Sequence, residues 1–328
     1  MSHNPTHKNH YVPRFYLKYW TNNNKIGVHD KLVAHSNQPI DRRASISNIG
    51  CKEFLYSSAL AKKEDEFESF LKSIEDRAAP IFSDIICERH QRLSRPEWEA
   101  LSDYVLIQFL RTPKSFLYFL HLWKKHCPEY IDQFCKQLPK LSPKYIEKIK
   151  TPFVIDPSKT IKFTTTDRSD NQTDISISIC LGRSFWLQAI ESYFQHYRPR
   201  LYSCQWRIFC LDDNQHELVT SDNPVTITGK DKLFRYWEIA PHDFIFFPIS
   251  PQHLLFTEVG SNKKYSNLKL CKFVDNINAD IAENAYRQIY FRDKTKIHSH
   301  IMKNRIVDER LYQAEREAWK QWGIDLTT

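Results

Sequence analysis

The sequence predicts an α+β fold in which a central helical layer packs on a mixed or antiparallel sheet built from N- and C-terminal strands. Short β-branched or aromatic runs occur near both ends of the chain, and helical periodicity fills the middle. The two kinds of segment do not alternate as they would in a parallel α/β fold. We therefore expect one intertwined domain over residues 1–328, with a helical part at about 63–150 and 181–199 and a β-rich part at about 203–292.

The composition is that of a folded chain with a sizeable core. Hydrophobic residues make up 41% of the 328 positions and charged residues 26%. The formal net charge of +8 favours polyanionic partners such as nucleic acid or nucleotides, although a charge kept for solubility explains the same value. Only 6 glycines are present, which argues against a glycine-rich phosphate loop.

Cysteine usage and hydropathy point to a cytoplasmic protein. The 8 cysteines are scattered without a CxxC pair, as expected for small buried side chains in a reducing compartment. The first residues show no signal-peptide pattern, and no apolar run is long enough to span a membrane. We therefore expect no membrane partner.

The first elements are two strands and a helix. Residues 26–35 and 46–56 are short and rich in β-branched or aromatic side chains, which predicts strands. Residues 63–89 repeat apolar side chains at intervals of three and four, which predicts a helix. Pro80 is expected to kink or divide that helix.

A second and a third helix should follow. Ser94-Arg95-Pro96-Glu97 is a capping-box pattern that predicts a helix start, and Thr112-Pro113 should end or kink this helix. Residues 114–150 continue with helical periodicity. The prolines expected to break it are Pro128, Pro139 and Pro143.

The centre of the chain combines a loop, two short strands and a helix. Residues 151–173 are rich in Thr, Asp, Ser and Pro and predict a loop with one strand at 161–165. Isoleucines alternate with serines over 175–179, which is a strand period. Helical spacing resumes over 181–199.

The remainder has β character and ends in helices. Residues 274–286 predict a helix, 288–291 a strand and 304–322 a closing helix. Short runs separated by turn residues predict the strands 205–211, 217–220, 225–228, 244–248 and 254–257.

The most informative segment is His10-Tyr11-Val12-Pro13-Arg14-Phe15-Tyr16-Leu17, which combines a titratable group, a rigid proline, a cation and aromatic rings. His10 can act as a general acid or base near neutral pH, or make a structural hydrogen bond as a buried imidazole. His7 lies three residues before His10, but no neighbouring acid or cysteine completes a metal site.

A second candidate is the polar end of an apolar helix, where Gln108 and Arg111 share one face. An inward-pointing arginine needs a carboxylate or phosphate partner. Anion recognition is one interpretation. The other is a salt bridge to one of three acidic residues, Glu66, Glu68 or Asp103.

A third candidate follows a predicted strand at Asp222-Asn223-Pro224. Its carboxylate can bind a metal or orient the His10 imidazole, or the segment can be a tight Asx-type turn. The basic and aromatic stretch 196–202 can stack on and neutralise a nucleic-acid strand, or simply be a solvated helix end. The P-loop, zincin, hydrolase and dinucleotide motifs do not occur.

Three segments together resemble the DUF4238 family, a widespread and mainly bacterial family of unknown function. They are residues 10–17, 108–113 and 221–225, the last followed by Phe247-Pro248-Ile249-Ser250-Pro251. The 278–290 stretch is similar too, so the resemblance covers nearly the whole chain. It implies that the family's marked polar positions are His10, Arg14, Gln108, Arg111, Asp222 and Asn223. It implies no activity.

If these side chains meet in one cleft, they form an active site, and we expect a phosphate-directed enzyme, a nuclease acting on RNA or DNA. His10 is then the general acid or base, and Arg14 and Arg111 hold phosphate bidentately. Asp222 orients His10 or holds a divalent cation such as Mg²⁺. Gln108 and Asn223 position the substrate.

Two alternatives stay open. The same residues can serve a non-catalytic nucleic-acid or nucleotide binding or sensor protein, or they can form a buried polar network that specifies the fold. A role in antiviral (anti-phage) defence, or as a toxin, is an expectation drawn from the family resemblance and not from any residue.

Overall fold

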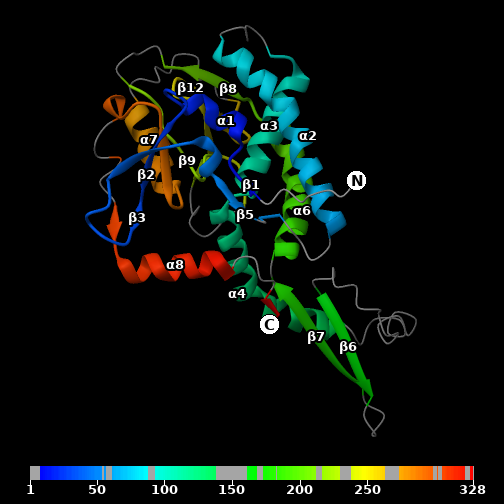
Figure 1. Ribbon diagram of the computed structural model, residues 1–328. Coiled ribbons are helices and arrows are strands. Elements are labelled where there is room, and N and C mark those ends of the chain that lie inside the picture. Colours follow the sequence, from blue (N-terminus) through cyan, green and yellow to red (C-terminus); the bar gives the residue numbers. More distant parts are fainter. Residues whose placement is uncertain are drawn as a thin grey trace, which may run out of the picture.

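The computed structural model confirms the α+β class: a group of long helices lies on one side, and short sheets with further helices lie on the other (Figure 1). Both the N-terminal and the C-terminal thirds contribute strands to the sheet side. The structure describes residues 8–53, 55–56, 61–87, 93–137, 161–167, 173–181, 183–211, 216–229, 238–262, 273–297, 301, 305–321 and 326–327.

The helical layer consists of α2 (Ala61–Ile86), α3 (Arg95–Leu110) and α6 (Arg183–Tyr202). Of the two effects expected at Pro80, a kink or a division of the helix, the division is wrong, because α2 runs through Pro80 without a break. Its buried stripe continues on both sides of the proline, from Ile74 to Ile85. Burial of that stripe outweighs the one backbone hydrogen bond that a proline removes.

The capping box predicted at the start of α3 is confirmed. The Glu97 carboxylate accepts a hydrogen bond from the Ser94 backbone N–H at 2.6 Å and one from its hydroxyl at 2.6 Å. The helix ends before Thr112, as expected, and α4 (Pro113–Gln137) begins at once. Since α4 passes through position 128, the break expected there is wrong; Pro139 and Pro143 lie outside the described residues.

One antiparallel sheet joins the two ends of the chain. Its order is β4 (Asp41–Ala44), β2 (Ile26–Asp30), β13 (Gln288–Phe291) and β9 (Thr220–Ser221). Val28 of β2 faces Tyr290 of β13 in this register. The pairing of early with late strands confirms the sheet predicted from the sequence.

A second antiparallel sheet lies entirely in the later part of the chain. Its order is β10 (Thr226–Thr228), β11 (Phe244–Ser250), β12 (His253–Glu258) and β8 (Arg207–Cys210). The helix α7 (Val274–Asn284) contacts both sheets, at β9 and at β10.

The N-terminal segment contains one element that the sequence did not predict. Strand β1 (Lys8–His10) pairs with β5 (Cys51–Glu53). The strand expected over 46–56 is wrong in its first half, where Ile46–Asn48 forms the 3₁₀ helix η2. The Ser45 hydroxyl accepts the Ser47 N–H at 3.3 Å, and this local bond competes with an extended backbone.

Smaller elements complete the chain. Helix α1 (Arg14–Leu17) continues into the 3₁₀ helix η1 (Lys18–Trp20), and η6 (Lys294–Lys296) follows β13. Strands β3 (Leu32–Val33) and β14 (Ile306–Val307) pair in parallel, ahead of the closing helix α8 (Glu309–Gln321).

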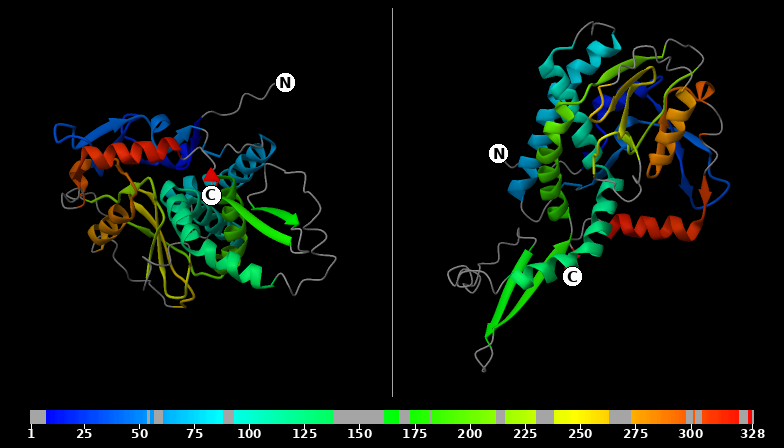
Figure 2. Two further views of the ribbon diagram at one scale, coloured as in Figure 1. Left: turned by 90° about the horizontal axis from the view of Figure 1, so that it is seen from below. Right: turned by 180° about the vertical axis from the view of Figure 1, so that it is seen from behind.

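A ribbon of β6 (Ile161–Asp167) and β7 (Thr173–Leu181), with the short β15 (Leu326–Thr327), extends away from the body (Figure 2). Among the described residues, no helix combines the length and the apolarity that crossing a membrane requires.

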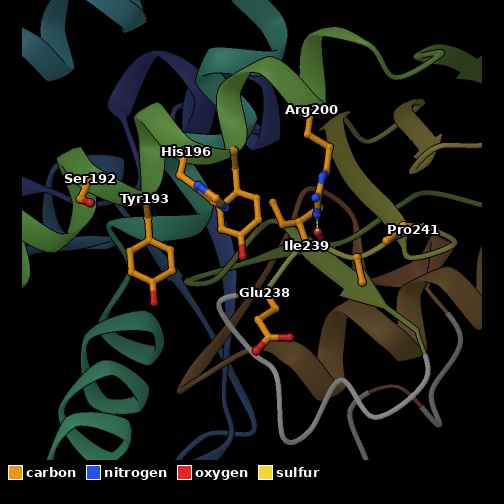
Figure 3. Close-up of a pocket in the computed structure, with 9 residues that line it drawn as sticks. Ser192, Tyr193, His196, Arg200, Glu238, Ile239 and Pro241 are labelled. Atoms are coloured by element: carbon orange, nitrogen blue, oxygen red, sulfur yellow. Dashed lines mark hydrogen bonds between the residues drawn. The ribbon is translucent and has the colours of Figure 1, made fainter. Parts of the chain in front are cut away.

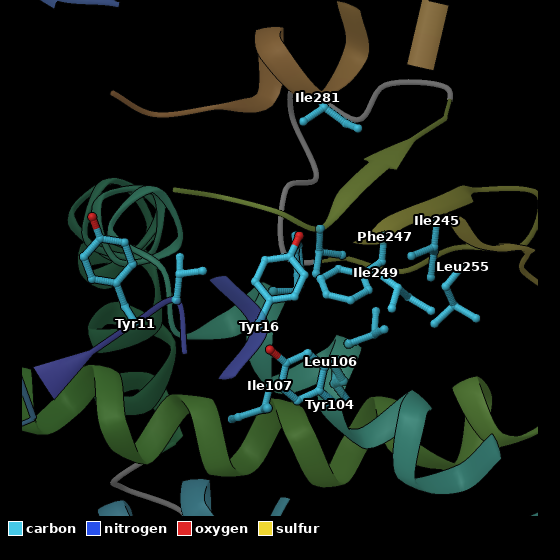
Figure 4. Close-up of a cluster of buried hydrophobic side chains, with 14 of the residues drawn as sticks. Tyr11, Tyr16, Tyr104, Leu106, Ile107, Ile245, Phe247, Ile249, Leu255 and Ile281 are labelled. Atoms are coloured by element: carbon cyan, nitrogen blue, oxygen red, sulfur yellow. The ribbon is translucent and has the colours of Figure 1, made fainter. Parts of the chain in front are cut away.

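The core lies between the helical layer and the sheets and is rich in aromatic rings. Tyr16 of α1 lies between the α3 side and Phe247 of β11 (Figure 4), with its ring centroid 5.2 Å from that of Phe247. Its buried hydroxyl lies 2.5 Å from the Thr220 hydroxyl and donates to the Pro248 carbonyl at 2.7 Å. Tyr16 therefore joins α1 to both sheets.

Replacement of Tyr16 by Phe should destabilise the protein by about 1–3 kcal/mol, because it leaves the buried Pro248 carbonyl without this donor. Chemical denaturation monitored by circular dichroism measures the change. Tyr19→Phe, at a half-buried ring in η1, is the control and should change the free energy of unfolding by less than about 0.5 kcal/mol. Equal effects of the two substitutions would contradict the role given to the Tyr16 hydroxyl.

Candidate functional site

The segment that begins with His10 is fixed against its neighbours by backbone contacts. The Val12 N–H donates to the Gly50 carbonyl at 3.0 Å. Gly50 has a φ of +58°, and a Cβ there would lie 2.9 Å from the Cβ of Val12. Because any larger residue is both strained and crowded at position 50, the glycine allows this close approach.

His10 is a half-buried imidazole at the end of β1. Its Nε2 lies 3.3 Å from the Ile46 carbonyl, which indicates that Nε2 carries the proton and that Nδ1 carries the lone pair. Burial lowers the pKa of His10 below its usual value, and the nearby cations Arg14, Lys8 and Arg111 lower it further, against the raising effect of the Ile46 carbonyl. His10 is therefore predominantly neutral at physiological pH.

The Arg111 guanidinium is completely buried and carries the main polar network of the fold. Its Nη1 donates to Glu75 of α2 at 2.6 Å, and its Nε and Nη2 donate to Gln108 Oε1 at 3.0 and 2.7 Å. Gln108 in turn donates from Nε2 to the Tyr11 carbonyl at 2.8 Å. We call Glu75, Gln108, Arg111 and the Tyr11 carbonyl the arginine network.

The phenols of Tyr56 and Tyr104 are buried beside Arg111. Burial raises the pKa of both phenols, and the positive charge of Arg111 partly opposes the rise. Both hydroxyls are therefore neutral at physiological pH.

The residue after Arg111 connects this network to the turn after β9. The Thr112 hydroxyl donates to Asn223 Oδ1 at 2.8 Å, and Asn223 Nδ2 donates to the Asn284 carbonyl at 3.2 Å. Asn284 returns hydrogen bonds from its Nδ2 to the carbonyls of Asn223 at 3.3 Å and Val225 at 2.9 Å. Asn223 is thus held on both sides by protein groups.

Asp222 is almost completely buried and binds backbone rather than side chains. Its Oδ1 accepts the Tyr286 N–H at 2.8 Å, and its Oδ2 accepts the N–H groups of Arg287 at 2.7 Å and Gln288 at 3.1 Å. Burial raises its pKa to about 6, and the three N–H donors and Lys31 act in the opposite direction. The carboxylate therefore fixes the chain between α7 and β13.

Two lysines meet the same corner at the C-terminus of α7. Lys31 Nζ donates to the carbonyls of Ala282 at 2.8 Å and Ala285 at 2.7 Å, and Lys114 Nζ donates to the Asn284 carbonyl at 2.8 Å. Cations at this position complement the helix dipole and satisfy its last carbonyls. Burial, and then the charge of Lys31, lower the pKa of Lys114 to about 8.

The six residues singled out in the sequence therefore fall into three groups. Gln108 and Arg111 bind each other, and Asn223 joins them through Thr112. Asp222 faces the backbone of 286–288, and His10 faces Ile46, so the expectation that Asp222 orients His10 is wrong. Arg14 is exposed, within electrostatic range of His10.

The sequence suggested Asp222 as a candidate ligand of Mg²⁺. Both oxygens of Asp222, the carboxylate expected to hold the ion, accept backbone N–H groups. Over the described ranges, no group of three His, Cys, Asp or Glu side chains is placed to hold a metal ion.

Sequence reasoning missed Glu75, which binds Arg111. Of the three acids that were considered, the Glu66 side chain lies outside the described part of the structure, and Glu68 accepts a hydrogen bond from Asn9. Asp103 instead accepts hydrogen bonds from Arg77 at 3.0 Å and from Arg198 Nε at 2.9 Å. Glu75 stands four residues after Leu71 and three before Ala78, within the buried stripe of α2. A carboxylate inside an apolar stripe was the signal that could have found it.

Comparison with known proteins gives one match. A family model described as "Protein of unknown function (DUF4238)" matches residues 8–295, which include all six marked positions. No curated protein and no solved structure matches the chain.

Replacement of Arg111 by Met should destabilise the protein by about 3 kcal/mol or more, because it leaves Glu75 and Gln108 without their shared partner. Urea denaturation measures the loss. Arg95→Met is the matched control, since Arg95 is 87% exposed in an i,i+4 pair with Glu99, and it should cost less than about 0.5 kcal/mol. Similar stabilities for the two variants would contradict the arginine network.

The raised pKa of Asp222 predicts a defined pH dependence. A carboxyl group with a folded-state pKa of about 6, above its unfolded value of about 3.9, stabilises the fold below about pH 4 and loses this contribution as the pH rises through 6. The difference in unfolding free energy between the natural protein and Asp222→Asn should therefore fall by about 2 kcal/mol between pH 4 and 7. A difference that grows over this range would show that the three N–H donors outweigh burial.

Proposed function

Because the chain belongs to DUF4238, a family described only as of unknown function, we propose its activity from the site itself: a phosphate-directed enzyme, a nuclease acting on RNA or DNA. The observation that carries the proposal is the environment of His10. The imidazole is neutral, carries its lone pair on Nδ1 and lies near the positive charges of Lys8 and Arg14. That combination suits acid–base chemistry on a phosphodiester.

The proposed roles differ between the exposed and the buried cations. Lys8 and Arg14 are exposed and can reach a phosphate group from solvent. Arg111 donates its hydrogen bonds to Glu75 and Gln108, and Gln108 holds the Tyr11 carbonyl. We therefore assign Arg111 as a positioning residue that fixes Tyr11 and, through it, His10. We assign structural roles to Asp222, which fixes the chain between α7 and β13, and to Asn223, which joins Thr112 to Asn284.

The chemistry can be written with these groups alone. His10 Nδ1 takes the proton of an attacking hydroxyl, from water or a ribose, while the new O–P bond forms. The P–O bond to the leaving oxygen breaks, and that oxygen takes a proton from the imidazolium or from solvent. Lys8 and Arg14 balance the negative charge that grows on the phosphoryl oxygens.

The proposal includes a cytoplasmic setting and leaves antiviral defence or toxicity as the biological context that the family resemblance suggested. Free thiols among the described cysteines support a reducing compartment. They are Cys51, Cys87, Cys204 and Cys210.

One observation favours the second candidate, a non-catalytic nucleic-acid or nucleotide binding or sensor protein. Arg111, Asp222 and Asn223 are all engaged in holding elements together. With those groups engaged, the exposed cations near His10 can bind an anion without turnover. Retention of labelled RNA or DNA on a filter without cleavage would support this candidate.

The nuclease proposal predicts cleavage of radiolabelled total RNA, single-stranded DNA or plasmid by the purified protein. His10→Ala should reduce the rate at least about 100-fold, which is the usual contribution of a general base. His35→Ala is the control, because the His35 imidazole is 55% accessible and lies outside this site. Circular dichroism verifies that each variant is folded.

Lanes with Mg²⁺, with Mn²⁺ and with EDTA separate the metal question from the acid–base question. We expect cleavage to continue in EDTA, because His10 and its cations supply the chemistry. Cleavage at an equal rate by His10→Ala would overturn the assignment of the base. Intact substrates in every lane would overturn the nuclease proposal and leave the binding candidate.

A further inference from the structure

A pocket of about 530 Å³ lies on the C-terminal half of α6, and its lining residues do not belong to the segment that carries His10. The opposite wall is the segment from Glu238 to Pro241 (Figure 3). A pocket of this size accommodates a ligand as large as one nucleotide. We infer that it binds a nucleotide, with the base on the tyrosine side and the phosphate beside Arg200.

The helix side of the pocket presents four residues on one face. Tyr193, His196, Tyr197 and Arg200 are spaced three, four and seven residues apart, so they follow one stripe of α6. The rings of Tyr193 and Tyr197 lie 6.0 Å apart at an interplanar angle of 30°. His196 meets the Tyr197 ring edge-on at 4.8 Å. Tyr197 is buried beneath this array, and the half-exposed ring of Tyr193 offers an aromatic face on which a base can stack.

The cation of the pocket is held in place by protein groups. Arg200 lies 5.8 Å from the centroid of the Tyr197 ring and donates from Nη1 to the Ile239 carbonyl. A guanidinium has five N–H donors, so this contact fixes the group and leaves donors that can face a phosphate. His196 is exposed at the same wall and adds a polar ring nitrogen.

The opposite wall is a rigid turn. The Ala240 N–H donates to Asp243 Oδ2 at 2.9 Å, and the Asp243 N–H returns to the Ala240 carbonyl at 3.2 Å. Since Arg200 also ties α6 to this turn, both walls exist before a ligand arrives. Preformed walls reduce the ordering cost of binding.

The charges at the two ends of the pocket differ in sign. Figure 3 shows Arg200 above Ile239 and Glu238 below it, with Tyr193 and His196 to the left on the helix side. A phosphate is attracted to the guanidinium end and is repelled by the carboxylate of Glu238. The N–H groups of a base or the hydroxyls of a sugar suit the carboxylate end. The pattern of π-surface, cation and acceptor therefore matches a nucleotide better than an uncharged aromatic ligand.

The test is isothermal titration calorimetry of the full chain with AMP, GMP, adenosine and a single-stranded pentanucleotide of dA. Binding of AMP or GMP supports a free nucleotide as the source, and binding of the pentanucleotide alone supports a nucleotide within a strand. Adenosine should bind more weakly than AMP, because it lacks the phosphate. Absence of binding by AMP, GMP and the pentanucleotide would overturn the inference.

Variants locate the binding. Tyr193→Ala should raise the Kd about tenfold or more, as expected when a stacking ring is lost, while Tyr193→Phe should keep it. Arg200→Gln should weaken the binding of AMP but not the binding of adenosine, which has no phosphate. Gln195→Ala, at an exposed position of α6 that does not line the pocket, is the control. An unchanged Kd in folded Tyr193→Ala would overturn the site. Because turnover is not measured, the outcome is independent of the nuclease proposal.

Discussion

The structure depends on one buried charge. A guanidinium with no exposed surface must find partners inside the protein, and Arg111 finds them on α2, on α3 and, through Gln108, on the carbonyl of Tyr11. The next residue, Thr112, binds Asn223 in the turn after β9. Two consecutive residues at the end of α3 therefore hold the helical layer, the N-terminal segment and the sheet side together.

This arrangement explains why groups far apart in the sequence matter to one another. Tyr11 is fixed by the arginine network, Val12 by Gly50 and Tyr16 by Thr220 and Pro248. His10 directly precedes this anchored segment, so its imidazole is held at the border between core and solvent. The buried residues supply rigidity. The half-buried His10 imidazole lies at the edge that they support, near the exposed charges of Lys8 and Arg14.

Local patterns in the sequence predicted the features that local physics determines. The capping box at Ser94, the strand 288–291 and the inward position of Arg111 each follow from a few neighbouring residues. The partner of Arg111 could not be predicted from neighbouring residues, because Glu75 meets Arg111 only through the packing of α2 on α3. The role of Asp222 could not be predicted either, since its partners are backbone N–H groups, which every residue except proline carries. Of the cations around His10, Arg14 was singled out in the sequence but Lys8 was not, because Lys8 and His10 share a face only in β1, a strand that the sequence did not predict.

The proposed function requires His10 to be a neutral base in a cluster of cations that binds phosphate. The most direct measurement is a nuclear magnetic resonance titration of the His10 imidazole with and without inorganic phosphate, with His35 as the internal reference. We predict that the pKa of His10 lies below the usual 6.5 in the free protein and rises when phosphate binds beside the ring. A His10 pKa that is unshifted and indifferent to phosphate would contradict it.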